Sequence, residues 1–190
     1  MLSYERKIQV LLQRYLSNIL HQNDVVVERQ WPAFPRDKRY SPRIDVAIGP
    51  FATETKLIDR YDQLSRTAKP FLDHCFDIFK ENMRAFNPGI FLENHNGYTN
   101  FNQNARCFIA IEIEKSGSRK HRLGDIVNAS ALGRIGLIIA WDAAALRSFL
   151  RIITYFDFLR EVKKNTFQTA NVAILEKEQF LYILDQFINH

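Results

Sequence analysis

The feature that most constrains the fold is an apolar run over residues 107–113 that brings two carboxylates, Glu112 and Glu114, one residue apart. A run of this kind is typical of an interior strand. Side chains alternate between the faces of a strand, so Glu112 and Glu114 are expected on one face and Lys115 on the other. A buried carboxylate is costly unless a cation or hydrogen-bond donors satisfy it. Two on one face therefore indicate a divalent metal ion.

A second interpretation of these two acids stays open. The strand can end in solvent, with Glu112 and Glu114 paired to the cations of the loop that follows. Those cations are Arg119, Lys120 and Arg122.

The rest of the chain alternates between helical and strand patterns. Apolar residues at helical spacing predict helices over residues 3–20, 123–133, 143–164 and 177–188, and two helices or one helix kinked at Pro70 over 61–86. Short apolar or β-branched runs predict strands over residues 25–28, 44–48, 134–141 and 172–175. The strand, helix, strand order after residue 107 predicts a parallel pair. Residues 51–105 form a helical and loop insertion between the second and third strands.

We therefore expect one α/β domain over residues 1–190, in which helices flank a mixed central β-sheet. The length and the 46% hydrophobic content suffice for one globular core. Cys75 and Cys107 lie in apolar surroundings and are expected to be buried, reduced thiols, which fits the cytoplasm. No stretch approaches the ~20 apolar residues of a membrane span, so no membrane partner is expected.

Charge favours a polyanionic partner. The net charge is +5, and residues 29–43 carry five basic residues against one acid, interleaved with Trp31, Phe34 and Tyr40. Cations can contact phosphates and aromatic rings can stack on bases, although a solvated hairpin loop explains the segment as well. A second basic loop covers residues 115–122. The candidate nucleic-acid contacts are Arg36, Lys38, Arg39, Arg119, Lys120 and Arg122.

Several other function classes lack their motifs. The sequence has no glycine-rich phosphate loop, no nucleophile elbow and no HxxxH spacing, so a nucleotide cofactor and serine-hydrolase chemistry are not expected. Asp142, which follows an apolar strand, is expected to cap a helix.

An acid on the first helix, Glu5, Asp45 on the second strand, and Glu112 and Glu114 on the third together resemble the PD-(D/E)xK nuclease superfamily, whose fold is restriction-endonuclease-like. The resemblance covers the order of elements over most of the chain. It implies that Asp45 and Glu112 bind Mg²⁺, for which Mn²⁺ is expected to substitute, and that Glu5 is the helical acid of part of the superfamily. Glu114 then occupies the usual place of the lysine.

Two departures from the family pattern leave the general base open. Asp45 follows Ile44 rather than proline, and the nearest lysine is Lys115, on the opposite face of a regular strand. Glu114 could orient or deprotonate the attacking water, or a β-bulge could bring Lys115 inward.

The resemblance implies a metal-dependent DNA phosphodiesterase, more readily a restriction-type endonuclease than an exonuclease. A homodimer is expected from the resemblance, with the apolar segment 61–86 either at the interface or packed in the core. The alternative is a non-catalytic protein of the same fold that binds nucleic acid or a protein partner. A rival position for the motif is Glu54-Thr55-Lys56, a literal ExK soon after Asp45, with a weaker strand around it.

Overall fold

The computed structural model describes residues 3–20, 25–34, 41–52, 56–89, 97–164 and 168–188. Within these ranges the protein is an α/β structure, and the order of its elements follows the predicted order. The helices are α1 (Tyr4–Leu20), α2 (Ile58–Thr67), α3 (Lys69–Phe86), the short 3-10 helix η2 (Tyr98–Asn100), α4 (Arg119–Leu132), α5 (Ala143–Glu161) and α6 (Lys177–Ile188). The strands are β1 (Val27–Pro32), β2 (Arg43–Ile48), β3 (Cys107–Glu114), β4 (Gly133–Ala140) and β5 (Val172–Glu176).

The five strands form one mixed sheet, whose spatial order β1-β2-β3-β4-β5 repeats the order in the chain. β1, β2 and β3 pair antiparallel, whereas β3, β4 and β5 pair parallel. The predicted parallel pair around α4 is therefore confirmed.

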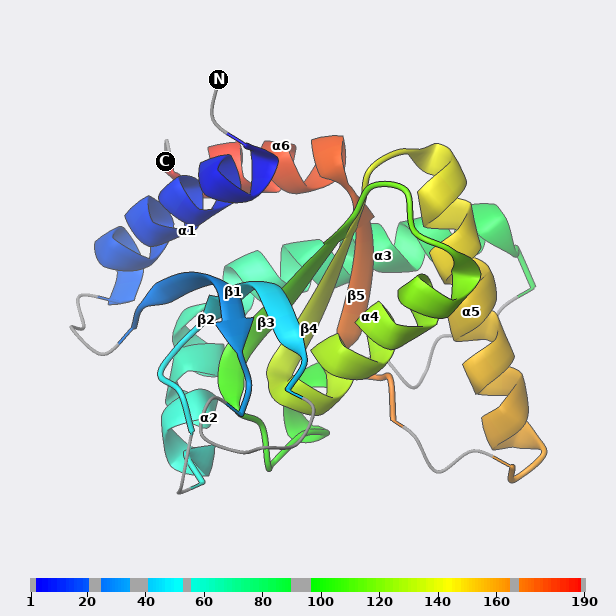
Figure 1. Cartoon of the computed structure of the whole chain (residues 1–190), viewed down its shortest axis with the longest axis horizontal. Helices are drawn as coiled ribbons and strands as arrows, with labels where there is room; N and C mark the ends of the chain where they lie inside the picture. The colour runs from blue at the N-terminus through cyan, green and yellow to red at the C-terminus, as the bar shows by residue number, and fades with distance from the viewer. Residues whose placement is uncertain are drawn as a thin grey trace.

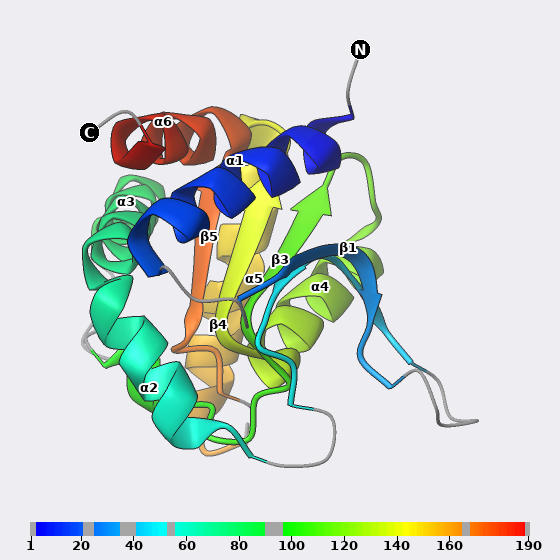
Figure 2. The same ribbon diagram turned by 90° about the vertical axis from the view of Figure 1, so that its left-hand side faces the viewer.

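Helices cover both faces of the sheet. α1, α3 and α6 lie on one face, and α4 and α5 on the other (Figure 1; Figure 2). β3, β4 and β5 are buried along almost their whole length, as expected for strands covered on both faces. Cys75 and Cys107 are buried free thiols in this core, as predicted. Among the described helices, none combines the length and the apolar character that crossing a membrane requires.

The insertion between β2 and β3 contains α2 and α3. The two helices are separated at Ala68, and Pro70 lies in the first turn of α3. Proline is tolerated there because the backbone N–H groups of a first turn have no partner within the helix. Most apolar residues of α3, including Phe71, Phe76 and Phe79, are buried in the core of the chain. Core packing, the other interpretation of this segment, accounts for these side chains, and the homodimer stays a prediction.

β1 extends further than its β-branched residues predicted. It continues through Trp31, which is buried and stacks on Phe51 with the ring centroids 4.7 Å apart. The guanidinium of Arg106 lies 4.6 Å from the centroid of the Phe34 ring. The Trp31 ring therefore packs within the protein, and the Phe34 ring, which is partly buried, contacts Arg106. Residues 35–40, which include Arg36, Lys38 and Arg39, lie outside the described residues.

α4 begins earlier than predicted, at Arg119, because the Ser118 hydroxyl accepts a hydrogen bond from the backbone N–H of His121. Gly133, the residue that follows α4, is extended, with φ −86° and ψ 143°. Space rather than φ requires a glycine there, since an added Cβ would lie 2.9 Å from the backbone nitrogen of Ala110. Asp142 caps α5 as predicted, accepting from the backbone N–H of Ala145 at 2.8 Å.

Candidate active site

Three polar residues lie in a row across the first three strands. Arg29 pairs with Val46 and Trp31 with Ile44, so Gln30 stands opposite Asp45. The pairing of Val46 with Ile111 places Asp45 opposite Glu112 in turn. Gln30 has a φ of 51°, the left-handed region that non-glycine residues seldom adopt. Backbone strain of this kind clusters at functional sites, although it does not identify one alone.

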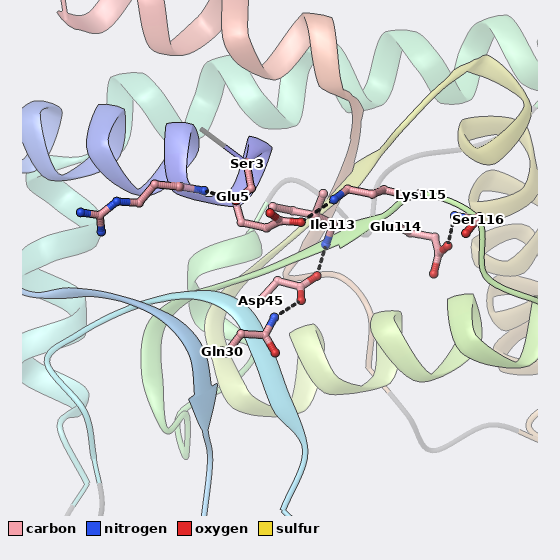
Figure 3. A network of polar contacts seen from close by, with 9 residues as sticks. Ser3, Glu5, Gln30, Asp45, Ile113, Glu114, Lys115 and Ser116 are labelled. Atoms are coloured by element: carbon pink, nitrogen blue, oxygen red, sulfur yellow. Dashed lines mark hydrogen bonds and ion pairs between the residues drawn. The ribbon is translucent and has the colours of Figure 1, made fainter. Parts of the chain in front are cut away.

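Asp45 ties β2 to both neighbouring strands (Figure 3). Its Oδ1 accepts from the Gln30 side chain at 2.7 Å, and its Oδ2 accepts from the backbone N–H of Ile113 at 2.8 Å. Burial raises the pKa of Asp45 above its ordinary value, and these two donors partly offset that rise. The carboxylate is therefore held between the strands in a fixed orientation.

Glu112 is the most buried acid of the site, with 3% of its surface exposed. Its Oε2 accepts from the backbone N–H of Asp45 at 3.3 Å, and its Oε1 from the side chain of Asn128 at 3.5 Å. Burial raises the pKa of Glu112 to about 9, and the charges of Asp45 and Asp125 act in the same direction. The interpretation of Glu112 as an acid at a solvated strand end is therefore wrong.

α4 adds a fourth carboxylate, Asp125, to the same face as Glu112. Burial raises the pKa of Asp125 to about 7, and the charge of Glu114, which shares a hydrogen bond with it, adds to the rise. Glu114 also receives backbone N–H groups, from Ser116 at 2.7 Å and from Gly117. Glu114 thus faces the acid cluster as expected, while its Oε1 is held by the turn after β3.

Lys115 lies just beyond the end of β3 and turns toward α1. Its ammonium is 2.7 Å from the Oε1 of Glu5 and 5.2 Å from the centroid of the Trp141 ring (Figure 3 shows the ion pair). The hydrogen bond from Lys115 lowers the pKa of Glu5 to about 2. The negative charge of Glu5 adds to the rise in the pKa of Asp45, and the positive charge of Lys115 partly offsets that rise. The structure therefore brings Glu5 and Lys115 together beside Asp45.

The three cations predicted near α4 differ in their surroundings. Arg119 and Lys120 are exposed in the first turn of the helix. Arg122 is half-buried and donates to the Ser148 hydroxyl at 2.9 Å, and its positive charge partly offsets the rise in the pKa of Asp125. Arg119 and Lys120 are thus available to a ligand, whereas Arg122 serves the acid cluster.

The donor set at Asp45 and Glu112 fits Mg²⁺. Mg²⁺ prefers hard oxygen ligands and is often bound by one or two carboxylates while it keeps several waters. Within the described residues, no group of three or more His, Cys, Asp and Glu side chains is arranged to hold a metal ion unaided. The buried Glu112 has only long hydrogen bonds, and burial together with the charges of Asp45 and Asp125 raises its pKa to about 9. Two carboxylates completed by water or substrate oxygens match these observations.

Sequence reasoning missed three residues of the site, namely Gln30, Asp125 and Asn128. Asp125 and Asn128 are three positions apart and so share a face of α4, which is a detectable spacing once the helix is known. No sequence signal marks Gln30, because its role follows from its register opposite Asp45. Of the rival ExK motif, Glu54 and Thr55 lie outside the described residues.

Comparison of the chain with protein-family models, with curated proteins and with solved structures gives no match in any of the three.

Proposed function

We propose that the protein is a metal-dependent DNA endonuclease of the restriction-endonuclease-like type, in which Asp45 and Glu112 hold Mg²⁺. The observation that carries this proposal is the meeting of these two acids from adjacent strands, where the Glu112 carboxylate accepts from the backbone N–H of Asp45 at 3.3 Å. A buried acid pair of this kind is costly without a cation. The mixed sheet and the helical insertion before β3 are consistent with the PD-(D/E)xK fold.

Mg²⁺ bound there would offset the negative charge that develops on a phosphodiester during hydrolysis and would lower the pKa of a bound water. The protein's own groups have separate tasks. Asp45 is fixed by Gln30 and by the Ile113 N–H, so its carboxylate needs no rearrangement. Asp125 and Glu114 share a hydrogen bond, and the pKa of Asp125, about 7, suits a group that takes up and releases a proton near neutral pH.

Lys115 is our candidate for the role of the lysine in the (D/E)xK motif. Its charge acts on Asp45, but its ammonium is bound to Glu5. We propose that, when DNA binds, the ammonium of Lys115 moves partly away from Glu5 and contacts the scissile phosphate. A phosphate oxygen and a carboxylate oxygen are comparable acceptors for an ammonium group.

DNA reaches the site over the start of α4. Arg119 and Lys120 are exposed there, and the N-terminus of a helix attracts phosphate. The net charge of +5 strengthens a polyanion's approach. These features position a phosphate backbone and carry no base recognition.

The test combines Mg²⁺ and Mn²⁺ titration by calorimetry with plasmid cleavage. Asp45→Asn and Glu112→Gln should lose both metal binding and cleavage, while Glu81→Gln, an exposed acid on α3, should keep both. Glu54→Ala should cleave normally, because Glu54 is not part of the proposed site. The rival ExK motif predicts instead that this variant loses cleavage. Cleavage that survives Glu112→Gln would refute the assignment of the site.

A non-catalytic protein of the same fold is the second candidate. Two observations favour it. The ammonium of Lys115 forms an ion pair with Glu5 at 2.7 Å, and position 114, where the motif has lysine, is a glutamate. Such a protein would bind DNA with strong salt dependence and give no products with either metal.

A further inference from the structure

α1 and α6 lie side by side on the outside of the molecule (Figure 1; Figure 2). The Tyr4 hydroxyl donates to the backbone carbonyl of Lys177 at 3.1 Å, and the ring centroids of Tyr15 and Phe187 are 5.9 Å apart. The two helices therefore run in the same direction. Residues at the same height on the two helices differ in number by 172 or 173, as the residues of these two contacts do.

The outward faces of the two helices carry opposite charges. Every exposed charged residue described on α1 is basic, and every one described on α6 is acidic. An exposed apolar side chain lies between the charges on each helix, namely Val10, which is 48% exposed, and Tyr182, which is 58% exposed. The charged residues are Arg6, Lys7 and Arg14 on α1, and Glu178 and Asp185 on α6.

A groove of about 400 Å³ lies between the two helices at the surface. The partly buried Leu11 and Leu181 line it together with Tyr182, so they add apolar surface to that of the exposed side chains. Exposed apolar surface with a polar rim is typical of a site at which proteins associate.

We propose that this face binds the same face of a second copy of the chain, around a two-fold axis parallel to α1 and α6. Such an axis lays α1 of each copy on α6 of the other and keeps every residue at its own height. Val10 and Tyr182 are 172 positions apart, so Val10 of each copy meets the partner's Tyr182. The basic residues of α1 then face the acidic residues of α6 in the partner. Arg6 is 172 positions from Glu178, and Arg14 lies within one turn of the height of Asp185.

Charge selects this axis over the alternative. A two-fold axis perpendicular to the helices would lay α1 on α1 and α6 on α6, so that like charges meet at both contacts. The axis parallel to the helices brings opposite charges together twice, because a two-fold interface repeats each contact. α6 has 12 residues and is therefore about 18 Å long, so the shared face is small. The dimer should be weak and reversible, with a Kd of micromolar order.

The experiment measures the mass of the protein by sedimentation equilibrium over a range of concentrations, without DNA or metal ion. The wild type should change from monomer to dimer as its concentration rises. Arg14→Glu and Asp185→Arg should each weaken the dimer about tenfold, because each reversal places like charges at two symmetric contacts. A mixture of the two variants should associate about as tightly as the wild type, because the mixed dimer has opposite charges at both contacts.

Tyr182→Ala should also weaken the dimer. Tyr155→Ala is the matched control, because Tyr155 is a 52% exposed tyrosine on α5, and this variant should dimerise as the wild type does. The proposal is overturned if the wild type stays monomeric, if the charge reversals leave the dimer unchanged, if mixing them does not restore association, or if Tyr155→Ala weakens the dimer and Tyr182→Ala does not. None of these outcomes depends on whether the protein cleaves DNA.

Discussion

The backbone N–H of Ile113 on β3 donates to the carboxylate of Asp45 on β2, at 2.8 Å. A second backbone donor, the N–H of Asp45, goes to the carboxylate of Glu112 rather than to a main-chain carbonyl. The regular pairing of β2 with β3 ends beside these residues, at Val46 and Ile111. Side-chain carboxylates thus replace main-chain carbonyl acceptors where the two strands separate, which fixes both acids.

Glu112→Gln should stabilise the protein at alkaline pH. The pKa of Glu112 is raised from 4.5 to about 9 in the folded state, so the folded protein holds a proton that the unfolded chain releases. Stability from this group is complete below about pH 4.5 and falls as the pH rises toward 9. The uncharged amide avoids the loss, so urea unfolding should show a gain of about 2 kcal/mol at pH 8 and a much smaller one at pH 5. A gain of equal size at both pH values would contradict the assignment.

Mg²⁺ should raise the melting temperature of the wild type at pH 8, because the ion binds the folded state and relieves the same repulsion. Asp45→Asn and Glu112→Gln should show no such rise. Differential scanning calorimetry with and without the metal measures the effect, and Glu81→Gln, which should respond like the wild type, serves as the control. A rise that persists in Glu112→Gln would place the ion elsewhere.

The Glu5–Lys115 ion pair should contribute weakly to stability. Its Lys115 side chain is 45% exposed, so solvent screening limits the coupling energy to about 0.5 kcal/mol. The pKa of Glu5 is lowered to about 2, so the contribution is present above pH 4.5 and is lost as the pH falls toward 2. A double-mutant cycle with Glu5→Gln and Lys115→Met at pH 6 and pH 3 measures this coupling. A coupling that grows toward pH 3 would have the wrong sign.

Two glycine substitutions should act in opposite directions. A Cβ at position 133 would meet Ala110 at 2.9 Å and the carbonyl oxygen of Ile135, so Gly133→Ala should cost about 2 kcal/mol or more. A Cβ at position 124, inside α4, meets no atom within 4 Å. Gly124→Ala should therefore stabilise the protein by about 0.5–1 kcal/mol through helix propensity. Thermal unfolding of both variants decides the matter, and similar melting temperatures would show that the contact at Gly133 can relax.

Arg119 and Lys120 should contribute to DNA affinity through phosphates alone. If they neutralise one phosphate each, the Arg119→Gln, Lys120→Gln double variant should reduce the slope of log K against log salt by about 2. The loss of affinity should be the same for unrelated DNA sequences. Arg84→Gln on α3 should leave the slope unchanged, and an unchanged slope in the double variant would remove α4 from the interface.

Most of the fold could be predicted from the sequence because its elements bury strongly patterned faces. The fully buried β3 and β4 read as apolar runs, and Ile8, Leu12 and Tyr15 of α1 mark its inner face at helical spacing. The end of β1 was missed because residues 28–30 are polar in a strand at the edge of the sheet, where burial imposes little pattern. Edge strands carry weak sequence signals for this reason.

The site was predictable only in part. The structure brings Asp45 and Glu112 together as expected, because strand register follows from the apolar pattern on either side. The ion pair between Lys115 and Glu5 was not predicted, because it depends on where α1 crosses the sheet. Asp125 was missed because an acid on a helix is ordinary until the helix packs against a particular strand. Whether such a residue belongs to the site depends on how its helix packs against the sheet, and neither residue spacing nor helix propensity predicts that packing.

The strand order of the sheet bears on how the chain reaches its native state. Each strand pairs with its neighbour in sequence. β1 can therefore associate with β2, β3 with β4 and β4 with β5 over comparatively short stretches of chain. The exception is the pairing of β2 with β3, because α2 and α3 intervene and a long loop must close. We expect docking of the β1–β2 hairpin onto β3 to be the late, rate-limiting event, and the site at Asp45 and Glu112 to assemble only then.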